Sequence, residues 1–134
     1  MIDKQVRTIA QAVEGIRDGA VLLVGGFGNS GRPAELMRGF LELGVRDLTI
    51  EAYNSTAGNV VVAALMAAGR VRKVMCSFPR GLQGHTVFDD LYKAGKIELE
   101  LIPQGTLAER LRAGAAGIGG FFTRTAAGTE LAKG

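Results

Sequence analysis

The apolar positions of this chain change their spacing from one segment to the next. In residues 3–17 they recur every three or four positions, which predicts an amphipathic helix with Asp3 as its N-cap and Gly19 just past its end. Residues 20–24 form a short continuous apolar run instead, which predicts a strand covered on both faces. A glycine-rich loop follows, and Pro33 can then take the first position of a helix because its missing N–H would have no intrahelical acceptor there.

The same alternation of apolar runs and helical patterns continues along the chain. In the helix after the glycine loop, Leu36, Met37 and Phe40 form the predicted buried stripe, which ends at Gly44. Further strands are predicted at 47–54, 71–78 and 96–103, and further helices at 58–69, 86–95 and 106–117. Strands that alternate with helices of about ten residues predict an α/β fold, with an open, mainly parallel sheet and helices on both faces. Because no repeat or linker interrupts the pattern, we expect residues 1–134 to form a single domain.

Composition narrows the class of protein. With 134 residues, of which 47% are hydrophobic and 22% charged, the chain has enough apolar material for a core. The net charge of +3 comes from basic residues scattered along several segments, so no nucleic-acid or membrane-binding patch is indicated, whereas small acidic ligands are compatible. A single cysteine excludes an internal disulfide framework, and the sequence contains no signal-peptide pattern and no membrane-spanning run. We therefore expect a cytoplasmic protein.

The glycine-rich loop lies in the stretch LLVGGFGNSGRPAELM, residues 22–37. Within it, Gly26, Gly28 and Gly31 spell G-x-G-x-x-G directly after a predicted strand and before a predicted helix. Glu51 follows twenty residues after Gly31, at the end of the next predicted strand. This arrangement matches the dinucleotide-binding fingerprint, including its acidic partner for the ribose.

Two details separate the loop from that fingerprint. Pro33 places the start of the helix after Gly31, whereas the third glycine of the fingerprint packs within the helix. The additional Gly25 also lengthens the flexible part of the loop. Three interpretations therefore stay open: a dinucleotide site, a site for another anionic or acyl ligand, and a purely structural turn. In the first two, glycines let backbone N–H groups approach a ligand oxygen, and the following helix N-terminus favours negative charge.

The remaining candidates for reactive chemistry are Cys76 and His85. A thiol becomes a nucleophile only when a base reaches it, and a cysteine on a strand is usually a small buried hydrophobe. We therefore expect Cys76 to be structural and His85 to be a surface or capping residue. No pair of histidines or cysteines has metal-ligand spacing, so no metal site is expected.

Two further motifs have structural explanations. In PQGTLAER, Thr106 can cap a helix with Glu109 completing a capping box, but this does not explain the amide of Gln104 at a strand-to-helix junction. Three basic residues lie at the start of the strand predicted at 71–78. We interpret them as solvent-exposed side chains, although a phosphate-bearing ligand could also bind them. They are Arg70, Arg72 and Lys73.

Two longer segments resemble a known family. DGAVLLVGGFGNSGRP, residues 18–33, and PQGTLAERLRAGAAGIGGFF, residues 103–122, are similar to blocks of the A (alpha) subunits of family I coenzyme A transferases. Residues 71–80 and 87–100 resemble the 3-oxoadipate branch of that family. The resemblance covers essentially the whole chain.

The resemblance implies a three-layered α/β transferase fold and an A2B2 assembly with a B subunit. The implied reaction moves CoA from succinyl-CoA to 3-oxoadipate, with a coenzyme A thioester as substrate and no metal or redox cofactor. In this family the nucleophile is a glutamate in a Ser-Glu-Asn-Gly motif of the B subunit, and the present chain lacks that motif. Tyr53 occupies the matching position and Glu51 lies two positions earlier, so we assign no catalytic residue here and expect no transferase activity from this chain alone.

The resemblance also implies which residues contact ligands. Asn54 and Gln104 are expected to orient the carboxylate substrate. The CoA-binding, oxyanion-stabilising loop is expected to comprise Val24, Gly25, Gly26, Phe27, Gly28, Asn29 and Ser30. Here the chain departs from the family at 53–56, YNST, where Asn-Asn-Ala-Gly is usual, and at 124–129, RTAAGT, where Pro-Thr-Gly-aromatic-Gly-Thr is usual.

The family's A-type chain also continues beyond residue 134, so we expect a fragment or a truncated subunit with an exposed edge. Two alternatives to a transferase subunit stay open. One is a dinucleotide-binding module of the Rossmann type, and the other is a non-catalytic chain that only assembles with a partner.

Overall fold

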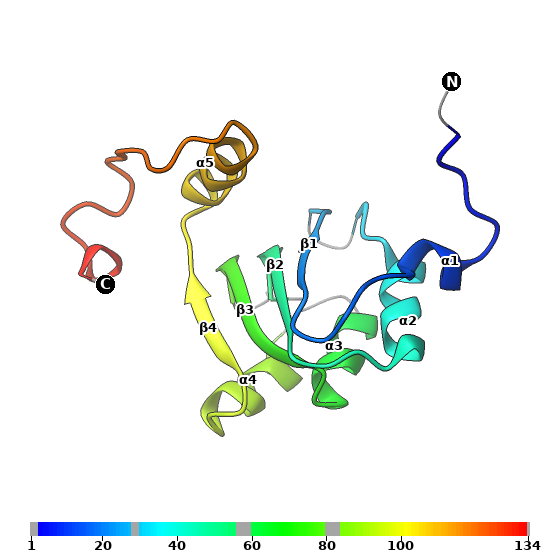
Figure 1. Ribbon diagram of the computed structural model, residues 1–134. Helices are drawn as coiled ribbons and strands as arrows, with labels where there is room; N and C mark the ends of the chain where they lie inside the picture. The colour runs from blue at the N-terminus through cyan, green and yellow to red at the C-terminus, as the bar shows by residue number, and fades with distance from the viewer. Residues whose placement is uncertain (1–2, 28–29, 56–59, 80–83, 134) are drawn as a thin grey trace.

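The fold is an α/β structure built on a four-stranded parallel sheet with the strand order β1-β2-β3-β4. The computed structural model describes residues 3–27, 30–55, 60–79 and 84–133 (Figure 1). The strands are β1 Val21–Val24, β2 Leu48–Asn54, β3 Val71–Phe78 and β4 Glu98–Leu101. The helices are α1 Ile9–Val13, α2 Ala34–Leu43, α3 Val60–Ala67, α4 Val87–Lys93, α5 Gln104–Ala115 and the 3-10 turn η1 Glu130–Ala132. The predicted alternation of strands and helices is confirmed.

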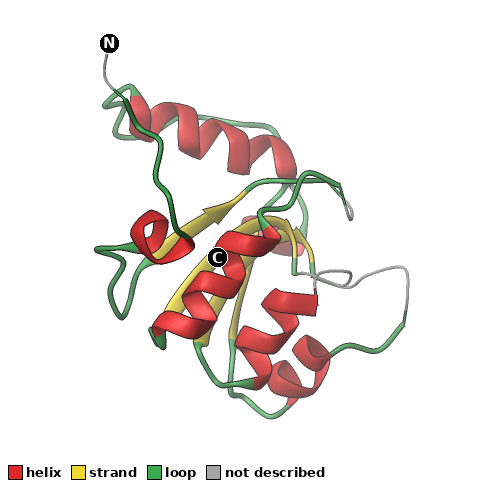
Figure 2. Cartoon of the chain, turned by 90° about the vertical axis from the view of Figure 1, so that its right-hand side faces the viewer, coloured by secondary structure: helices red, strands yellow, loops and turns green. Residues whose placement is uncertain are grey.

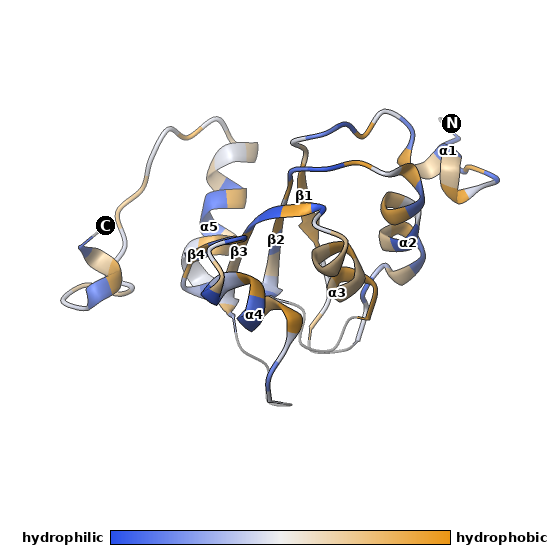
Figure 3. Ribbon diagram, turned by 90° about the horizontal axis from the view of Figure 1, so that it is seen from below, coloured by the Kyte–Doolittle hydropathy of each residue, from blue (hydrophilic) through white to orange (hydrophobic). Residues whose placement is uncertain are grey.

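One face of the sheet forms the core. Leu22, Ile50, Val74 and Leu99 are register partners on successive strands and lie in one row across this face. Each crossover leads to the neighbouring strand in the same direction, and right-handed crossovers of this kind place their helices on one face. Helices α2, α3 and α4 accordingly pack side by side against the row. The middle helix, α3, is apolar over its whole length (Figure 3). This composition suits its position, because α2 and α4 flank it on its two sides.

The opposite face of the sheet is covered only in part. Helix α5, the longest, lies apart from the other helices and contacts β3 (Figures 1 and 2). On β1, the alternate residues Val21 and Leu23 are each 59% exposed, whereas Leu22 and Val24 are buried. The prediction that this strand is covered on both faces is therefore wrong for the described chain. A continuous apolar run cannot show whether a second layer reaches it, because that depends on where a distant helix packs.

The first helix is much shorter than predicted. Helix α1 covers only Ile9–Val13 and is capped by Thr8, whose hydroxyl accepts the Gln11 N–H while the Gln11 side chain returns to the Thr8 backbone. Asp3 is not the N-cap, since its carboxylate accepts the backbone N–H of Gln5 instead. Gly15 has a φ of +87°, a conformation that ends the helix before the predicted Gly19. A strong local capping box thus overrides the wider apolar periodicity.

The second helix follows the prediction closely, with two corrections. Pro33 is the N-cap rather than the first helical residue, and Gly44 ends the helix in the left-handed conformation as expected. Met37 is 1% exposed, but Leu36 is 37% exposed and does not belong to the buried stripe. The buried face continues through Gly39, which packs directly against α1.

The start of α5 also differs from the prediction. The helix begins at Gln104 with Pro103 as N-cap, so Thr106 lies within the first turn and does not form a capping box with Glu109. Glu109 instead pairs with Arg112 one turn later, at 2.6 Å. The ring of Pro103 fixes a backbone geometry suited to a cap, and its carbonyl accepts the N–H of Leu107. The helix therefore starts before Thr106, the predicted cap.

Beyond α5 the chain leaves the sheet. Residues 116–133 extend away from the strands as a loop that closes with the 3-10 turn η1 (Figure 1). Phe122 in this segment is fully exposed. Among the described residues, none of the helices has both the length and the apolar character needed to span a membrane.

Candidate functional site

The glycine loop lies at the carboxyl end of β1, on the edge where all the parallel strands end. Phe27 and Ser30 form an antiparallel bridge in which each N–H donates to the carbonyl of the other at 3.0 Å. Gly26 and Gly31 flank this bridge with φ values of +113° and +69°. The loop is therefore a tight reversal of the backbone. The amides of Phe27 and Ser30 close it, so they are not directed at a ligand.

Gly26 cannot carry a side chain in this loop. A Cβ placed on it would lie 2.7 Å from Cγ of Arg32 and 2.9 Å from the carbonyl oxygen of Ser30. Gly25, by contrast, has no atom within 4 Å of the corresponding position. Gly25 thus leaves the backbone open to the approach of a ligand, while close packing requires a glycine at position 26.

Arg32 and Asn54 meet above the ends of β1 and β2. The Nη2 of Arg32 donates a hydrogen bond to Oδ1 of Asn54, the last residue of β2. Both side chains are partly buried. Burial lowers the pKa of the Arg32 guanidinium from its ordinary value, although arginine stays charged at any physiological pH. The contact places a partly desolvated cation beside a residue predicted to orient the substrate.

A row of aromatic rings runs along the same edge. Tyr53 lies between Phe27 and Phe78, with ring centroids 4.7 Å and 5.0 Å apart. Phe27 lies in the glycine loop after β1, Tyr53 lies in β2 and Phe78 ends β3, so the loop and the neighbouring strands together bring the rings side by side. Ser55 is buried, its N–H donates to the carbonyl of Phe78 at 3.1 Å, and its hydroxyl donates to the carbonyl of Pro79. Tyr53 and Ser55, which depart from the family pattern, are thus packed into the structure.

A cavity of about 350 Å³ opens beneath the loop, on the face of the sheet that carries α5. Its lining is mainly apolar, with one carboxylate, that of Glu51, among the sheet residues. The residues that line it are Leu23, Val24, Gly25, Gly26, Glu51, Ala52, Tyr53, Leu107 and Leu111. Gly25 and Gly26, which are among these lining residues, belong to the predicted CoA-binding loop, so the cavity borders that loop.

Glu51 is not placed as the dinucleotide fingerprint requires. It lies in the middle of β2, paired in register with Leu23 and Met75, and not at the strand end. Burial raises the pKa of its carboxyl group, with Arg110 opposing and Glu100 reinforcing the effect. A ribose partner has to stand clear of the strand to reach a nucleotide. The prediction that Glu51 lies at the strand end is therefore wrong, which counts against a dinucleotide site.

Gln104 lies on the same edge of the sheet as Asn54, but two strands away. It is the first residue of α5, directly after Pro103, and is exposed. The structure thus places both predicted substrate-binding amides at the carboxyl edge, the usual ligand edge of an open parallel sheet. Gly28 and Asn29 of the predicted CoA-binding loop, and Thr56 of the departing segment, lie outside the described residues.

Cys76 and His85 do not form a catalytic pair. Cys76 is fully buried in the sheet, and desolvation raises the pKa of its thiol from 9.0 to about 11. His85 lies at the exposed start of α4, where its Nε2 is 2.7 Å from Oδ1 of Asp90. The expected structural roles of the two residues are confirmed. The described part of the chain contains no cluster of three or more potential ligands that could hold a metal ion.

The basic residues at the entrance of β3 have protein partners. Arg70 donates to the carbonyl of Gly44 at 2.7 Å, and Arg72 lies 3.5 Å from the carboxylate of Glu98. The Nζ of Lys73 is 2.7 Å from the carboxylate of Glu100. These contacts support the structural interpretation of this segment over a phosphate site.

Two features of this edge do not follow from the sequence patterns described above. One is the return of Arg32 over the loop, for which the only local signal is its position directly after the last loop glycine. The other is the aromatic row, whose members are 26 and 25 residues apart in sequence, as 53 − 27 and 78 − 53 show. Only the fold of the glycine loop and the neighbouring positions of β2 and β3 bring these rings side by side.

The chain is similar to known coenzyme A transferases along nearly its whole length. A family model described as coenzyme A transferase matches residues 6–134. The A subunit of the 3-oxoadipate CoA-transferase of Pseudomonas putida is 56% identical over 134 residues, which is 100% of this chain and 58% of that protein. The A subunit of a probable succinyl-CoA:3-ketoacid coenzyme A transferase of Bacillus subtilis is 38% identical over 131 residues, 98% of this chain and 54% of that protein. The chain thus spans little more than half the length of these curated relatives.

A solved structure supports the same fold. The glutaconate coenzyme A-transferase of Acidaminococcus fermentans superposes with a TM-score of 0.78 and covers 96% of this chain and 41% of its own. At 22% sequence identity the likeness concerns the fold alone. The three-layered α/β arrangement expected from the family is in accord with this neighbour.

Proposed function

Because the chain belongs to the coenzyme A transferase family, we propose that it forms the A-type part of an enzyme that moves CoA from succinyl-CoA to 3-oxoadipate. The observation that carries the proposal is the 56% identity to the A subunit of a 3-oxoadipate CoA-transferase along the entire chain. Several relatives are themselves named as A subunits, so a partner chain is part of the proposal. We place the nucleophile on that B subunit, in an A2B2 assembly in the cytoplasm.

The proposed reaction is a double displacement. A glutamate carboxylate of the partner attacks the thioester carbonyl of succinyl-CoA, the C–S bond breaks, and an acyl anhydride and CoA thiolate form. The thiolate attacks the glutamyl carbonyl, which releases succinate and leaves a glutamyl-CoA thioester. A carboxylate of 3-oxoadipate then attacks this thioester, and the released thiolate returns to the oxoacyl carbonyl. The products are 3-oxoadipyl-CoA and the original glutamate.

The present chain contributes binding and charge stabilisation to these steps. Each attack develops a negative oxygen, and backbone N–H groups directed at it lower the barrier. Since Phe27 and Ser30 use their amides within the loop, we assign this role to the backbone at Gly25 and Gly26, which borders the cavity. Asn54 and Gln104 would orient the incoming carboxylate from the same edge. No metal or redox cofactor enters the scheme, because each step is an acyl transfer.

The proposal is tested by combining this chain with a B subunit of the family and measuring 3-oxoadipyl-CoA formation from succinyl-CoA. Activity is expected in the mixture and not from either chain alone. Gly26→Val should abolish it without preventing assembly, since a side chain there would meet Arg32 and Ser30. Gly114→Ala is the matched control, because this α5 glycine has open space around it and should leave the rate unchanged.

Three outcomes would count against the proposal. Co-purification without activity would support an assembly partner that takes no part in catalysis. Failure to associate would remove the transferase interpretation. Binding of a nicotinamide dinucleotide by the chain alone, lost on Glu51→Ala, would instead revive the dinucleotide-binding alternative.

A further inference from the structure

We propose that Glu100 is a positioning residue, which fixes the direction of α5 and thereby holds Gln104 where it orients a carboxylate substrate. This inference rests on the proposed function, in which Gln104 has that role. It adds a residue that acts on the substrate only through the helix. The resemblance to the family assigns Glu100 no role.

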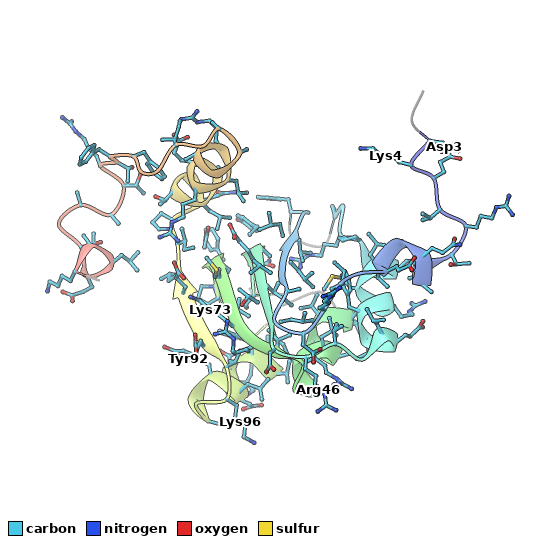
Figure 4. The ribbon with its side chains drawn as sticks, in the orientation of Figure 1. Asp3, Lys4, Arg46, Lys73, Tyr92 and Lys96 are labelled. Carbon is cyan, nitrogen blue, oxygen red and sulfur yellow. The ribbon has the colours of Figure 1, made fainter. Side chains whose placement is uncertain are left out.

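Glu100 joins three elements of the fold through its two carboxylate oxygens. It lies in β4, and its Oε2 is 2.7 Å from Nζ of Lys73 on the neighbouring strand β3 (Figure 4). Its Oε1 is 2.6 Å from Nη1 of Arg110, which belongs to α5. Hydrogen bonds from Lys73 and from Arg110 lower the pKa of the Glu100 carboxyl group, so it stays ionised at neutral pH. The carboxylate therefore ties α5 to two strands at once.

Helix α5 has little apolar packing that could fix its direction instead. It contacts the sheet mainly at β3, and Ala113 is the one buried residue of this fully described helix. Leu111, which lines the cavity, is 43% exposed. Helix α3 is shorter and yet buries Val62, Leu65 and Met66. The contact of α5 with Glu100 is therefore a principal attachment of this helix to the sheet.

The place of Arg110 along α5 suits a contact that sets the direction of the helix. The start of α5 is held by Ile102, which is buried and donates its N–H to the carbonyl of Cys76 at 3.0 Å. Gln104 is the first residue of the helix, and Arg110 follows six residues later (110 − 104), about 9 Å further along the axis. A rod held at its start and at a second point has a fixed direction. Loss of the second point lets α5 tilt about Pro103, which displaces the side chain of Gln104.

A second ion pair of α5 provides a comparison. Glu109 and Arg112 also meet at 2.6 Å, but both belong to α5, so their contact joins the helix only to itself. The two carboxylates are about equally exposed, at 33% for Glu100 and 34% for Glu109. Glu109→Gln therefore removes an ion pair of the same kind without removing an attachment to the sheet, which makes it the matched control.

The surroundings of Arg110 indicate where α5 moves when the attachment is lost. Burial raises the pKa of Glu51 on β2 and the charge of Arg110 opposes this rise, so Arg110 lies within electrostatic reach of a second carboxylate. In Glu100→Gln, the guanidinium is therefore attracted towards β2. Leu107 and Leu111, which belong to the same helix and line the cavity, move with it. The expected tilt carries α5 towards β2.

Residual dipolar couplings of the backbone amides measure the direction of α5 relative to the sheet without any assay of activity. In the unsubstituted chain and in Glu109→Gln, the couplings of α5 should fit the same alignment as those of the strands. In Glu100→Gln, the strand couplings should stay unchanged, which excludes misfolding, while those of α5 no longer fit. Arg110→Gln, which breaks the contact from the helix, should give the same result. Unchanged α5 couplings in both variants would overturn the inference.

A binding measurement asks whether the direction of α5 serves Gln104. In the complex with the B subunit, isothermal titration should show that Glu100→Gln weakens the binding of succinate about 3- to 10-fold, because a displaced Gln104 keeps only part of its hydrogen bond to the carboxylate. Glu109→Gln should change it less than about twofold. In a Gln104→Ala background, Glu100→Gln should have no further effect, since the two residues act through one contact.

The outcomes separate this inference from the proposed function. An equal loss of succinate binding with and without Gln104 would overturn the inference, because Glu100 would then act by another route. An equal loss in Glu109→Gln would overturn it as well, since any charge pair of α5 would have the same effect. If succinate binding depends on Glu100 through Gln104 but the complex transfers no CoA, the proposed function fails and the inference stands.

Discussion

The close packing around Gly26 makes a quantitative prediction for the substitution Gly26→Ala. The new methyl would lie 2.7 Å from Cγ of Arg32, 2.9 Å from the carbonyl oxygen of Ser30 and 3.2 Å from the backbone N of Arg32. The Arg32 side chain can move, but the two backbone atoms belong to the same loop and cannot yield separately. The φ of +113° adds strain, because side-chain-bearing residues rarely adopt it.

The two contributions give the expected size of the effect. Unfavourable backbone dihedrals cost about 1–3 kcal/mol, and overpacking of one methyl costs about the same. Because relaxation of the loop relieves part of both, we expect Gly26→Ala to lower the free energy of unfolding by about 2–4 kcal/mol. Gly25→Ala is the matched control, since no atom lies within 4 Å of its added methyl and its φ is not positive.

Urea denaturation of the two variants and the unsubstituted chain checks this prediction. The control should unfold within about 1 kcal/mol of the unsubstituted chain, since Gly→Ala at a compatible position changes stability by roughly that amount or less. Gly26→Ala should shift the midpoint to lower urea with an unchanged slope, which reports stability alone. Equal midpoints for Gly25→Ala and Gly26→Ala would refute the reasoning, because the loop would then not need the geometry described here.

Two further predictions concern ionisable groups, one buried and one partly buried. Cys76 should resist a thiol reagent such as DTNB in the native chain and react after unfolding, because a pKa raised from 9.0 to about 11 and full burial both suppress the reactive thiolate. Labelling of the native chain at the rate of free cysteine would contradict this. Glu51→Gln should raise the urea midpoint at pH 7, because burial raises the pKa of Glu51 and ionisation then opposes folding. The gain should shrink as the pH falls through the raised pKa of Glu51 in the folded chain, and it should vanish below the ordinary pKa of 4.5, where the carboxyl group is protonated in both states; a gain that grows on acidification would reverse the assigned sign.

The elements of the fold follow from local sequence. The pattern VRKVMCSF predicted β3 with its observed bounds, Val71–Phe78, and Gly44 ended α2 where expected. Runs of apolar residues, helical periodicity and glycines that end helices act over a few residues, so their physical meaning is present in the sequence itself. The conversion of these elements into a parallel sheet follows as well, because alternating strands and helices leave few other topologies.

Local rules also explain two of the errors. The capping box of Thr8 and Gln11 shortened the first helix, and Pro103 displaced Thr106 as the cap of α5. In both cases two local signals competed, and the pattern alone did not show which would prevail. At α1, the capping box formed by Thr8 and Gln11 outweighs the run of suitably spaced apolar residues.

The features of the site depend on tertiary structure. The sequence marks the glycine loop and the amides of Asn54 and Gln104 as candidates, but the contact of Arg32 with Asn54 joins residues 22 positions apart. The aromatic row likewise forms only when β2 and β3 lie side by side and the glycine loop places Phe27 beside Tyr53. The exposure of Leu23 depends on where α5 packs. Secondary structure is a short-range property of the chain, whereas the burial, charge environment and partners of a side chain are set by segments that only folding brings together.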